Sequence, residues 1–159
     1  MPIGDSGTTG RYTDQSFTVA GWVKVTTADH QAVLAQDGAT RAAFYLMYDD
    51  PTDKWCITIP SVDTGTATWQ YVVSVNPAQL DTWTHVVARY DATARELRLY
   101  VNGVLQGTRA NTVTWNSSSV FHVGKAKSSY FVNGGTVDRV RAWQGLLSEG
   151  DILTDMNEG

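Results

Sequence analysis

The sequence predicts an all-β domain, a two-sheet antiparallel β-sandwich of the jelly-roll type, from two observations. In residues 96–101, apolar side chains alternate with polar or aromatic ones, as in a strand with one buried face, and Asn102-Gly103 then favours a tight hairpin turn. Similar strand-like runs recur at short, even intervals along the chain. We expect strands at residues 17–25, 32–36, 42–49, 54–60, 69–75, 82–90, 96–101, 120–124 and 136–143.

One short C-terminal helical turn is expected after Leu147. Ser148 can accept a hydrogen bond from the backbone, and Asp151 stands three residues later, at the reciprocal position of a capping box. The chain has 159 residues, with no internal repeat and no low-complexity linker. We therefore expect residues 1–159 to form a single domain, and the short lead from Met1 to the first strand suggests a module excised from a larger protein.

Composition limits the possible partners. The formal net charge of −4 argues against nucleic-acid binding, which needs a positive surface, and no apolar run is long enough to span a membrane. Cys56 is the only cysteine, so an intrachain disulfide is excluded. Because Cys56 lies in a strand-like run with no evident base beside it, we interpret it as a small, half-buried structural residue.

Several motifs identify a family resemblance. Residues 82–103 combine a Trp-Thr-His opening, a Tyr-Asp pair at the loop and Leu-Tyr-Val-Asn-Gly before the turn; residues 16–24, 121–124 and 135–149 also fit. Together they resemble the laminin G-like branch of the concanavalin A-like lectin/glucanase superfamily. The resemblance implies the β-sandwich and an extracellular, secreted setting. An excess of Arg over Lys, with much Ala, Thr and Val, suggests a bacterial source.

Catalysis is not supported by the carboxylates. The glucanases of this superfamily need closely spaced acidic residues on one strand, but Glu96, Glu149 and Glu158 are the only glutamates and none has such a partner. No Gly-x-Ser-x-Gly motif is present for a nucleophilic serine. We therefore expect a non-enzyme, with a glycoside hydrolase as the least favoured function.

Calcium is the one cofactor that the sequence suggests, as a structural ion. The resemblance implies that Asp138, on the closing strand, joins backbone carbonyls around Ca²⁺; the alternative is a hydrogen bond from Asp138 to the N-terminal segment. A second candidate is the acidic group Asp49, Asp50 and Asp53, whose carboxylates suit a hard cation. A solvated hairpin turn is the favoured explanation of that group.

Strand alternation predicts which side chains face the core. The inward set consists of Val19, Val23, Phe44, Leu46, Ile57, Ile59, Leu97 and Leu99. The opposite set consists of Trp22, Lys24, Tyr45, Met47, Arg98 and Tyr100. If Asp138, Val140 and Ala142 turn inward on the closing strand, then Arg139, Arg141 and Trp143 join the outward set and give one sheet an arginine-and-aromatic face.

Two interpretations of that face remain open. Aromatic rings stack on sugars and arginine forks bind carboxylates or sulfates, which would suit an acidic glycan. In the other interpretation, Arg98, Arg139 and Arg141 pair with carboxylates on a solvated sheet. Trp69 and Trp115, beside turns, are candidates for a sugar platform at a loop edge. The candidate ligand-binding residues are Tyr45, Trp69, Arg98, Tyr100, Trp115, Arg139 and Arg141.

These observations favour a module that binds carbohydrate or a cell-surface glycoconjugate within a larger secreted polypeptide, beside neighbouring domains. The alternative, from a different class, is a structural domain that docks against its neighbours and binds no sugar. An exposed aromatic groove with polar neighbours would favour the first, and a flat apolar patch the second.

Overall fold

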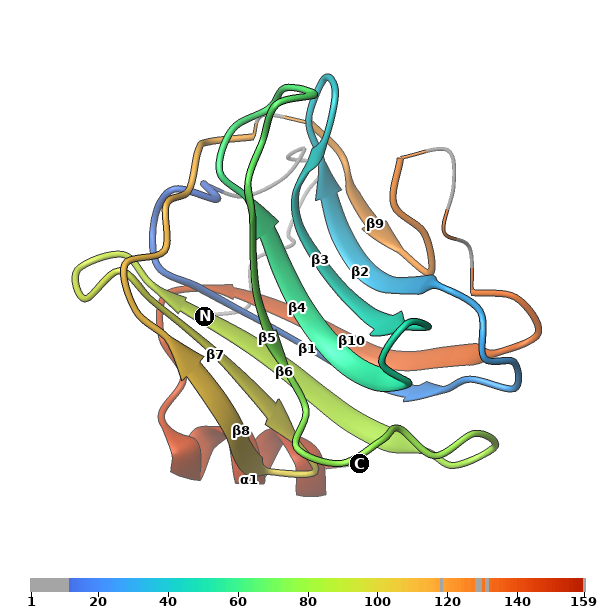
Figure 1. The fold of residues 1–159 in the computed structure, drawn as a ribbon. Coiled ribbons are helices and arrows are strands. Elements are labelled where there is room, and N and C mark those ends of the chain that lie inside the picture. Colours follow the sequence, from blue (N-terminus) through green and yellow to red (C-terminus); the bar gives the residue numbers. More distant parts are fainter. Residues whose placement is uncertain (1–11, 118, 128–129, 131, 159) are drawn as a thin grey trace.

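The computed structural model describes residues 12–117, 119–127, 130 and 132–158. Within these residues, ten strands form two five-stranded antiparallel sheets that face each other (Figure 1), as predicted. The first sheet, called sheet A, has the order β10 (Thr136–Gln144), β1 (Phe17–Lys24), β6 (Thr84–Asp91), β7 (Glu96–Val101) and β8 (Val104–Arg109). The second, sheet B, has the order β5 (Trp69–Val73), β4 (Lys54–Pro60), β3 (Ala42–Asp49), β2 (Gln31–Asp37) and β9 (Phe121–Val123).

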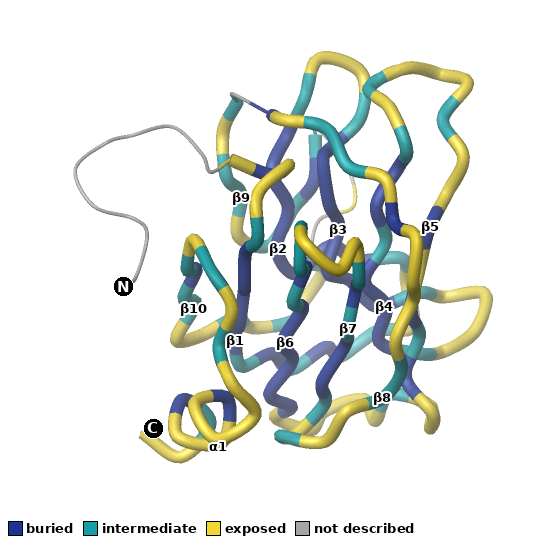
Figure 2. Tube along the Cα trace, turned by 90° about the vertical axis from the view of Figure 1, so that its left-hand side faces the viewer, coloured by how far each residue is buried: buried dark blue, intermediate teal, exposed yellow. Residues whose placement is uncertain are grey.

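The core lies between the two sheets. All eight residues predicted to point inward belong to one buried cluster, which also holds Trp55 and the ring pair Phe17 and Phe44, tilted by 30° with centroids 5.1 Å apart. Figure 2 shows that the central strands of both sheets are buried along most of their length, whereas β8 is largely exposed. Burial of this apolar surface is the main force that holds the sheets together.

Nine strands match the expected segments to within two residues, and the turn between β7 and β8 matches too. Asn102 and Gly103 have φ values of 49° and 79°, the left-handed conformation that a two-residue hairpin turn of this type requires. The strand β8 itself was not predicted. Its residues are exposed or half-buried on both faces, so the sequence lacks the apolar alternation that identifies a strand.

The first and last strands of the described chain are paired with each other. In sheet A, β1 lies between β10 and β6, with Phe17 opposite Gln144 on one side and opposite Tyr90 on the other. The side chain of Thr18 donates to the carbonyl of Gly145, which reinforces this pairing. Sheet A is therefore completed only when both ends of the domain are in place.

The helix α1 (Glu149–Asn157) lies against the outer face of sheet A (Figure 1). It begins with the predicted capping box, in which Ser148 and Asp151 exchange hydrogen bonds, and extends beyond the single turn expected. Its residue Ile152 packs against Ala20, Val87 and Tyr100 of the sheet. Among the described residues, no helix is long and apolar enough to cross a membrane.

No helix of the described residues covers the outer face of sheet B, but the segment after β9 folds back over β2. The amide of Gly124 donates to the carbonyl of Val33, and the amide of Ala32 donates to the carbonyl of Tyr130. All seven residues of β2 are consequently buried. Beside this segment, the outer face over β3, β4 and β5 is hollowed, although Tyr45, Met47 and Cys56 on it are largely buried.

Candidate functional site

A groove of about 610 Å³ lies on the outer face of sheet B. Strand side chains that point away from the core form its base, because successive residues of a strand face opposite sides of the sheet. These base residues are Met47 of β3, Cys56 and Thr58 of β4, and Val73 of β5. We call this cavity the sheet B groove.

Aromatic side chains form the rim of the sheet B groove. Tyr45 is 5% exposed, and its ring lies edge-on to Trp69 at 5.8 Å and to Tyr130 at 6.4 Å between centroids. The Tyr45 hydroxyl accepts a hydrogen bond from the amide of Ala42, which fixes the ring. Trp69, Tyr71 and Tyr130 remain 43%, 56% and 44% exposed, so three large rings present surface to the groove.

Arg41 brings a positive charge to the groove. Its guanidinium carbon lies 5.3 Å from the centre of the Trp69 ring, a favourable cation–π arrangement. The backbone before β3 is held by Asp63, whose carboxylate accepts from the amides of Ala39, Thr40 and Arg41 at 2.7, 2.8 and 2.6 Å. The turn that carries Arg41 is therefore fixed through its backbone.

Asp63 titrates at lower pH than an ordinary aspartate. Burial acts to raise its pKa, but the amide donors of Arg41, Thr40 and Ala39, with the charge of Lys127, outweigh burial and lower the pKa. The ammonium of Lys127 lies near the same turn and donates to the carbonyls of Gly38 and Ala39 at 2.6 and 3.0 Å. Carboxylate and ammonium thus hold the turn from two sides.

Asp63→Asn is expected to destabilise the protein at neutral pH. In acid, the difference in stability between the variant and the wild type is expected to disappear. Asn keeps one acceptor oxygen but no charge, so we expect a loss of about 1 to 2 kcal/mol in the free energy of unfolding at pH 7. The pKa of Asp63 is lower in the folded state than in the unfolded state. The stabilisation by its charge is therefore complete above the unfolded-state pKa and is lost as the pH falls through the folded-state pKa. Urea unfolding of both proteins from pH 7 downward measures the difference; a difference that does not change with pH would contradict this role of the charge.

The other end of β3 carries a polar group. His30 Nδ1 lies 2.9 Å from Asp50 Oδ1 and 3.7 Å from Asp49 Oδ1, and its ring contacts Tyr130 edge-on at 5.2 Å. His30 and Asp49 line the groove. The sheet B groove thus runs along β3 from a cation at Arg41 to a histidine and carboxylate near Asp49.

Cys56 lies at the base of the groove as a buried strand residue, in line with its structural interpretation. Burial, reinforced by the charge of Asp49, raises the pKa of the Cys56 thiol to about 12. At neutral pH the thiol therefore stays protonated and is a poor nucleophile.

The predicted ligand-binding residues separate onto different surfaces. Tyr45 and Trp69 line the sheet B groove. Trp115 does not: its indole N–H donates to the carbonyl of Pro60 at 3.0 Å, and its ring packs at Gly38, where an added Cβ would collide with it. The remaining four, Arg98, Tyr100, Arg139 and Arg141, belong to sheet A, on the other side of the sandwich. The outward set therefore forms two faces, one on each sheet.

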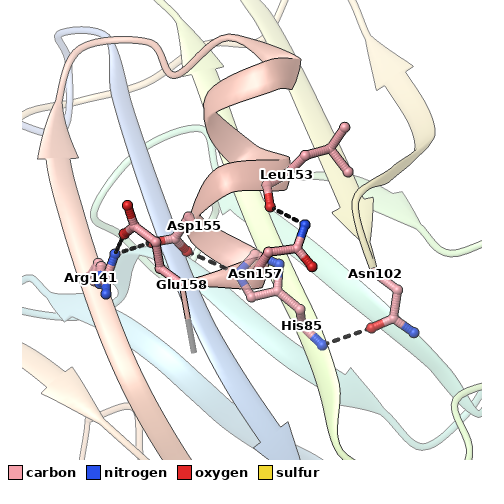
Figure 3. Close-up of polar contacts among 7 residues, drawn as sticks. All are labelled: His85, Asn102, Arg141, Leu153, Asp155, Asn157 and Glu158. Atoms are coloured by element: carbon pink, nitrogen blue, oxygen red, sulfur yellow. Dashed lines mark hydrogen bonds and ion pairs between the residues drawn. The ribbon is translucent and has the colours of Figure 1, made fainter.

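On sheet A, each of the three arginines is paired with a carboxylate. Arg98 pairs with Glu96 and Arg139 with Asp138, while Arg141 donates to Asp155 at 2.7 Å and to Glu158 at 2.9 Å (Figure 3). This confirms the interpretation in which these arginines pair with carboxylates. Tyr100, 1% exposed, is unavailable to a ligand on this face, because α1 covers it.

The closing strand β10 contains a bulge that the alternation argument did not anticipate. Arg139 has φ 49°, and the register of β1 against β10 shifts between Ala20 and Trp22. Val137 and Val140 therefore both pack on the core, and the Asp138 side chain is 62% exposed. Of the three residues whose inward position was left open, Val140 and Ala142 face the core and Asp138 does not.

The two candidate calcium sites are engaged in other contacts. Asp138 accepts from the backbone amide of Arg139 at 2.8 Å. The alternative hydrogen bond, from Asp138 to the N-terminal segment, lies outside the described residues, which begin at residue 12. Asp49 accepts from Thr52, Asp50 contacts His30, and Asp53 accepts from the Tyr48 hydroxyl. In the described part of the chain, no three His, Cys, Asp or Glu side chains are grouped to hold a metal ion. Calcium binding stays a prediction.

Sequence reasoning missed several groove residues: His30, Arg41, Tyr71, Lys127 and Tyr130. Tyr71 could have been identified from the sequence, because it follows Trp69 by two positions in the same expected strand and must share its face. Arg41, Lys127 and Tyr130 come from segments outside the long strands. Their meeting over sheet B depends on tertiary contacts such as that of Tyr130 with Ala32, which have no local sequence signal.

The fold is that of a lectin-like binding domain: an antiparallel β-sandwich with an open aromatic groove on one sheet. The chain belongs to the concanavalin A-like lectin/glucanases superfamily, whose Laminin_G_3 family model matches residues 5–153. The search of curated proteins gave no significant match.

Solved structures support the fold. The binding domain of Paraclostridial Mosquitocidal Protein 1 gives a TM-score of 0.70 at 11% identity and is matched over 92% of this chain and 38% of that one. The CBM40 of Ruminococcus gnavus IT-sialidase, solved with alpha2,3 sialyllactose, gives a TM-score of 0.67 at 15% identity. The match covers 90% of this chain and 83% of that one. Trypanosoma rangeli sialidase, in complex with sialic acid, gives a TM-score of 0.66 at 21% identity. The match covers 90% of this chain and 23% of that one. The chain thus spans less than half of the first and third of these proteins.

Proposed function

We propose that the domain is a non-catalytic module that binds carbohydrate in the sheet B groove. The observation that carries this proposal is the set of three exposed rings, Trp69, Tyr71 and Tyr130, around one groove. Exposed aromatic surface is costly in water and is suited to stacking against the apolar faces of sugar rings. The polar groups along the rim supply hydrogen bonds to hydroxyls.

Two further observations support this proposal. The family is one of lectins and glucanases, and similar structures include a sialidase CBM40 with a bound sialylated sugar and a toxin binding domain. Among the described residues that line the groove, Asp49 is the only carboxylate. Glycoside hydrolysis uses a pair of carboxyl groups across the bond, so this lining favours binding over catalysis.

Trp69→Ala is expected to weaken carbohydrate binding about tenfold, because a stacked ring contributes on the order of 1 to 2 kcal/mol. Calorimetric titration of the purified domain with a panel of neutral and acidic oligosaccharides measures the change. Trp83→Ala is the matched control: Trp83 is 41% exposed but lies outside the groove, beside Trp22 and Asp138. Equal losses in the two variants would argue against the groove as the binding site.

The same titration, repeated with calcium and with a chelator, tests the predicted ion. Binding that needs calcium would support a lectin with a structural Ca²⁺ and direct mutation to Asp138 and to Asp49. Binding unaffected by the chelator would remove calcium from the function. No binding to any glycan in either condition would favour the alternative, a domain that docks against protein neighbours.

A further inference from the structure

We propose that the sugar bound in the sheet B groove is an acidic one, whose anionic group is held by Arg41. This inference rests on the proposed function and specifies its ligand class. The three arginines of sheet A that the sequence predicts for an acidic ligand, Arg98, Arg139 and Arg141, are each paired with a carboxylate. The structure instead leaves Arg41, on the opposite sheet, for this role.

Arg41 is the groove residue best suited to bind an anion. Among the described residues, no carboxylate lies within 4.0 Å of its guanidinium nitrogens, in contrast to Arg98, Arg139 and Arg141. Within the described part of the chain, its side chain makes one hydrogen bond, a long one, from Nε to the carbonyl of Thr64 at 3.4 Å. The terminal nitrogens therefore keep donors for a carboxylate or sulfate, which the planar guanidinium can bind with two parallel hydrogen bonds.

The position of Arg41 is fixed without cancelling its charge. Asp63 uses its carboxylate oxygens on three backbone amides, and one of these belongs to Arg41 itself. Trp69 supports the guanidinium from the side through its ring. A preorganised cation loses less side-chain freedom on binding than one that must be ordered by the ligand.

Charge along the groove also favours an acidic sugar at this end. The ammonium of Lys127 lines the same groove and lies at the turn of residues 38–41, so two cations line this end of the groove, while the Asp63 carboxylate at that turn accepts from backbone amides and does not line it. The carboxylate of Asp49 stands at the far end of β3, where it would repel an anion but can accept from hydroxyls. The groove is thus polarised, which would orient the sugar with its anionic group toward Arg41.

Matched glycan pairs test this proposal. We would titrate sialyllactose against lactose, oligogalacturonate against its methyl ester, and a sulfated galactan oligosaccharide against its desulfated form. In at least one pair the acidic member is expected to bind about tenfold more tightly, and Arg41→Gln is expected to abolish that preference while leaving the neutral member unchanged. The first two pairs report carboxylates and the third reports sulfate.

Arg109→Gln is the control, because Arg109 is an exposed arginine on β8 of the other sheet and its loss removes the same charge. Unfolding curves of both variants establish that the fold is kept. Equal binding of acidic and neutral members, or an acidic preference that survives Arg41→Gln, would overturn this inference and leave the proposed function standing. If no glycan of either kind binds, the proposed function fails and this inference fails with it.

Discussion

Asp155→Ala is expected to lower the free energy of unfolding by about 3 to 5 kcal/mol, the cost of breaking a buried ion-paired network. The Asp155 side chain is 6% exposed and joins two partners from sheet A: His85 Nε2 at 2.9 Å and Arg141 Nη1 at 2.7 Å (Figure 3). His85 is itself buried, and its other ring nitrogen has no hydrogen-bond partner among the described residues. Without Asp155, the whole imidazole is left buried with unsatisfied polar atoms. Urea denaturation followed by circular dichroism measures the loss.

Glu158→Gln is the matched control for Asp155→Ala. Glu158 contacts the same Arg141 nitrogen, at 2.9 Å, but its side chain is 56% exposed. Exposed ion pairs contribute little, so we expect a change within about 0.5 kcal/mol. Because α1 and the sheet B groove lie on opposite sides of the sandwich, folded Asp155→Ala protein should retain its glycan affinity. Equal destabilisation by the two substitutions would contradict a special role for the buried carboxylate.

Tyr45→Ala is the second large effect, because it acts on stability and binding together. Removing a nearly buried aromatic side chain costs about 3 kcal/mol or more in the free energy of unfolding. The rings of Trp69 and Tyr130 also lose the neighbour that each contacts edge-on, so the groove rim loses its fixed geometry. We expect saturable glycan binding to disappear in calorimetric titration at temperatures where the variant remains folded.

Tyr45→Phe separates the two contributions of this residue. It keeps the ring but removes the acceptor for the Ala42 amide, so we expect a loss of about 1 kcal/mol in stability and near-normal binding. Binding of wild-type strength in folded Tyr45→Ala protein would show that the rim between Trp69 and Tyr130 does not contact the ligand. The candidate site would then have to be sought elsewhere on the molecule.

Much of the fold could be predicted from the sequence because its signals are local. Alternation placed the inward residues of β1, β3, β4 and β7 correctly, and the Asn102-Gly103 turn was recognisable from two residues. The strand β8 lacked such a signal, since it is exposed on both faces. The bulge at Arg139 was also invisible, because a positive φ at a non-glycine residue is imposed by pairing with β1.

The candidate site was predictable only in part, for a physical reason. Tyr45 and Trp69 were found because strand residues have a face that the sequence period reveals. Alternation alone could not say which sheet an outward residue belongs to, so residues of two opposite faces were combined into one set. It also could not show that α1 would cover Tyr100 and supply Asp155 to Arg141, since both facts depend on where a helix docks.

The pairing of β1 with β10 has a consequence for how the domain folds during synthesis. The ribosome makes β1 first among the described strands and β10 last, yet the two are hydrogen-bonded neighbours, with β10 at the edge of sheet A and β1 next to it. Once β6 has paired with β1, β1 still has one open edge that another strand could occupy, and β10 closes it only at the end. Such long-range pairing places the domain among slow folders, in which the order of translation exposes an aggregation-prone edge until the last strand arrives.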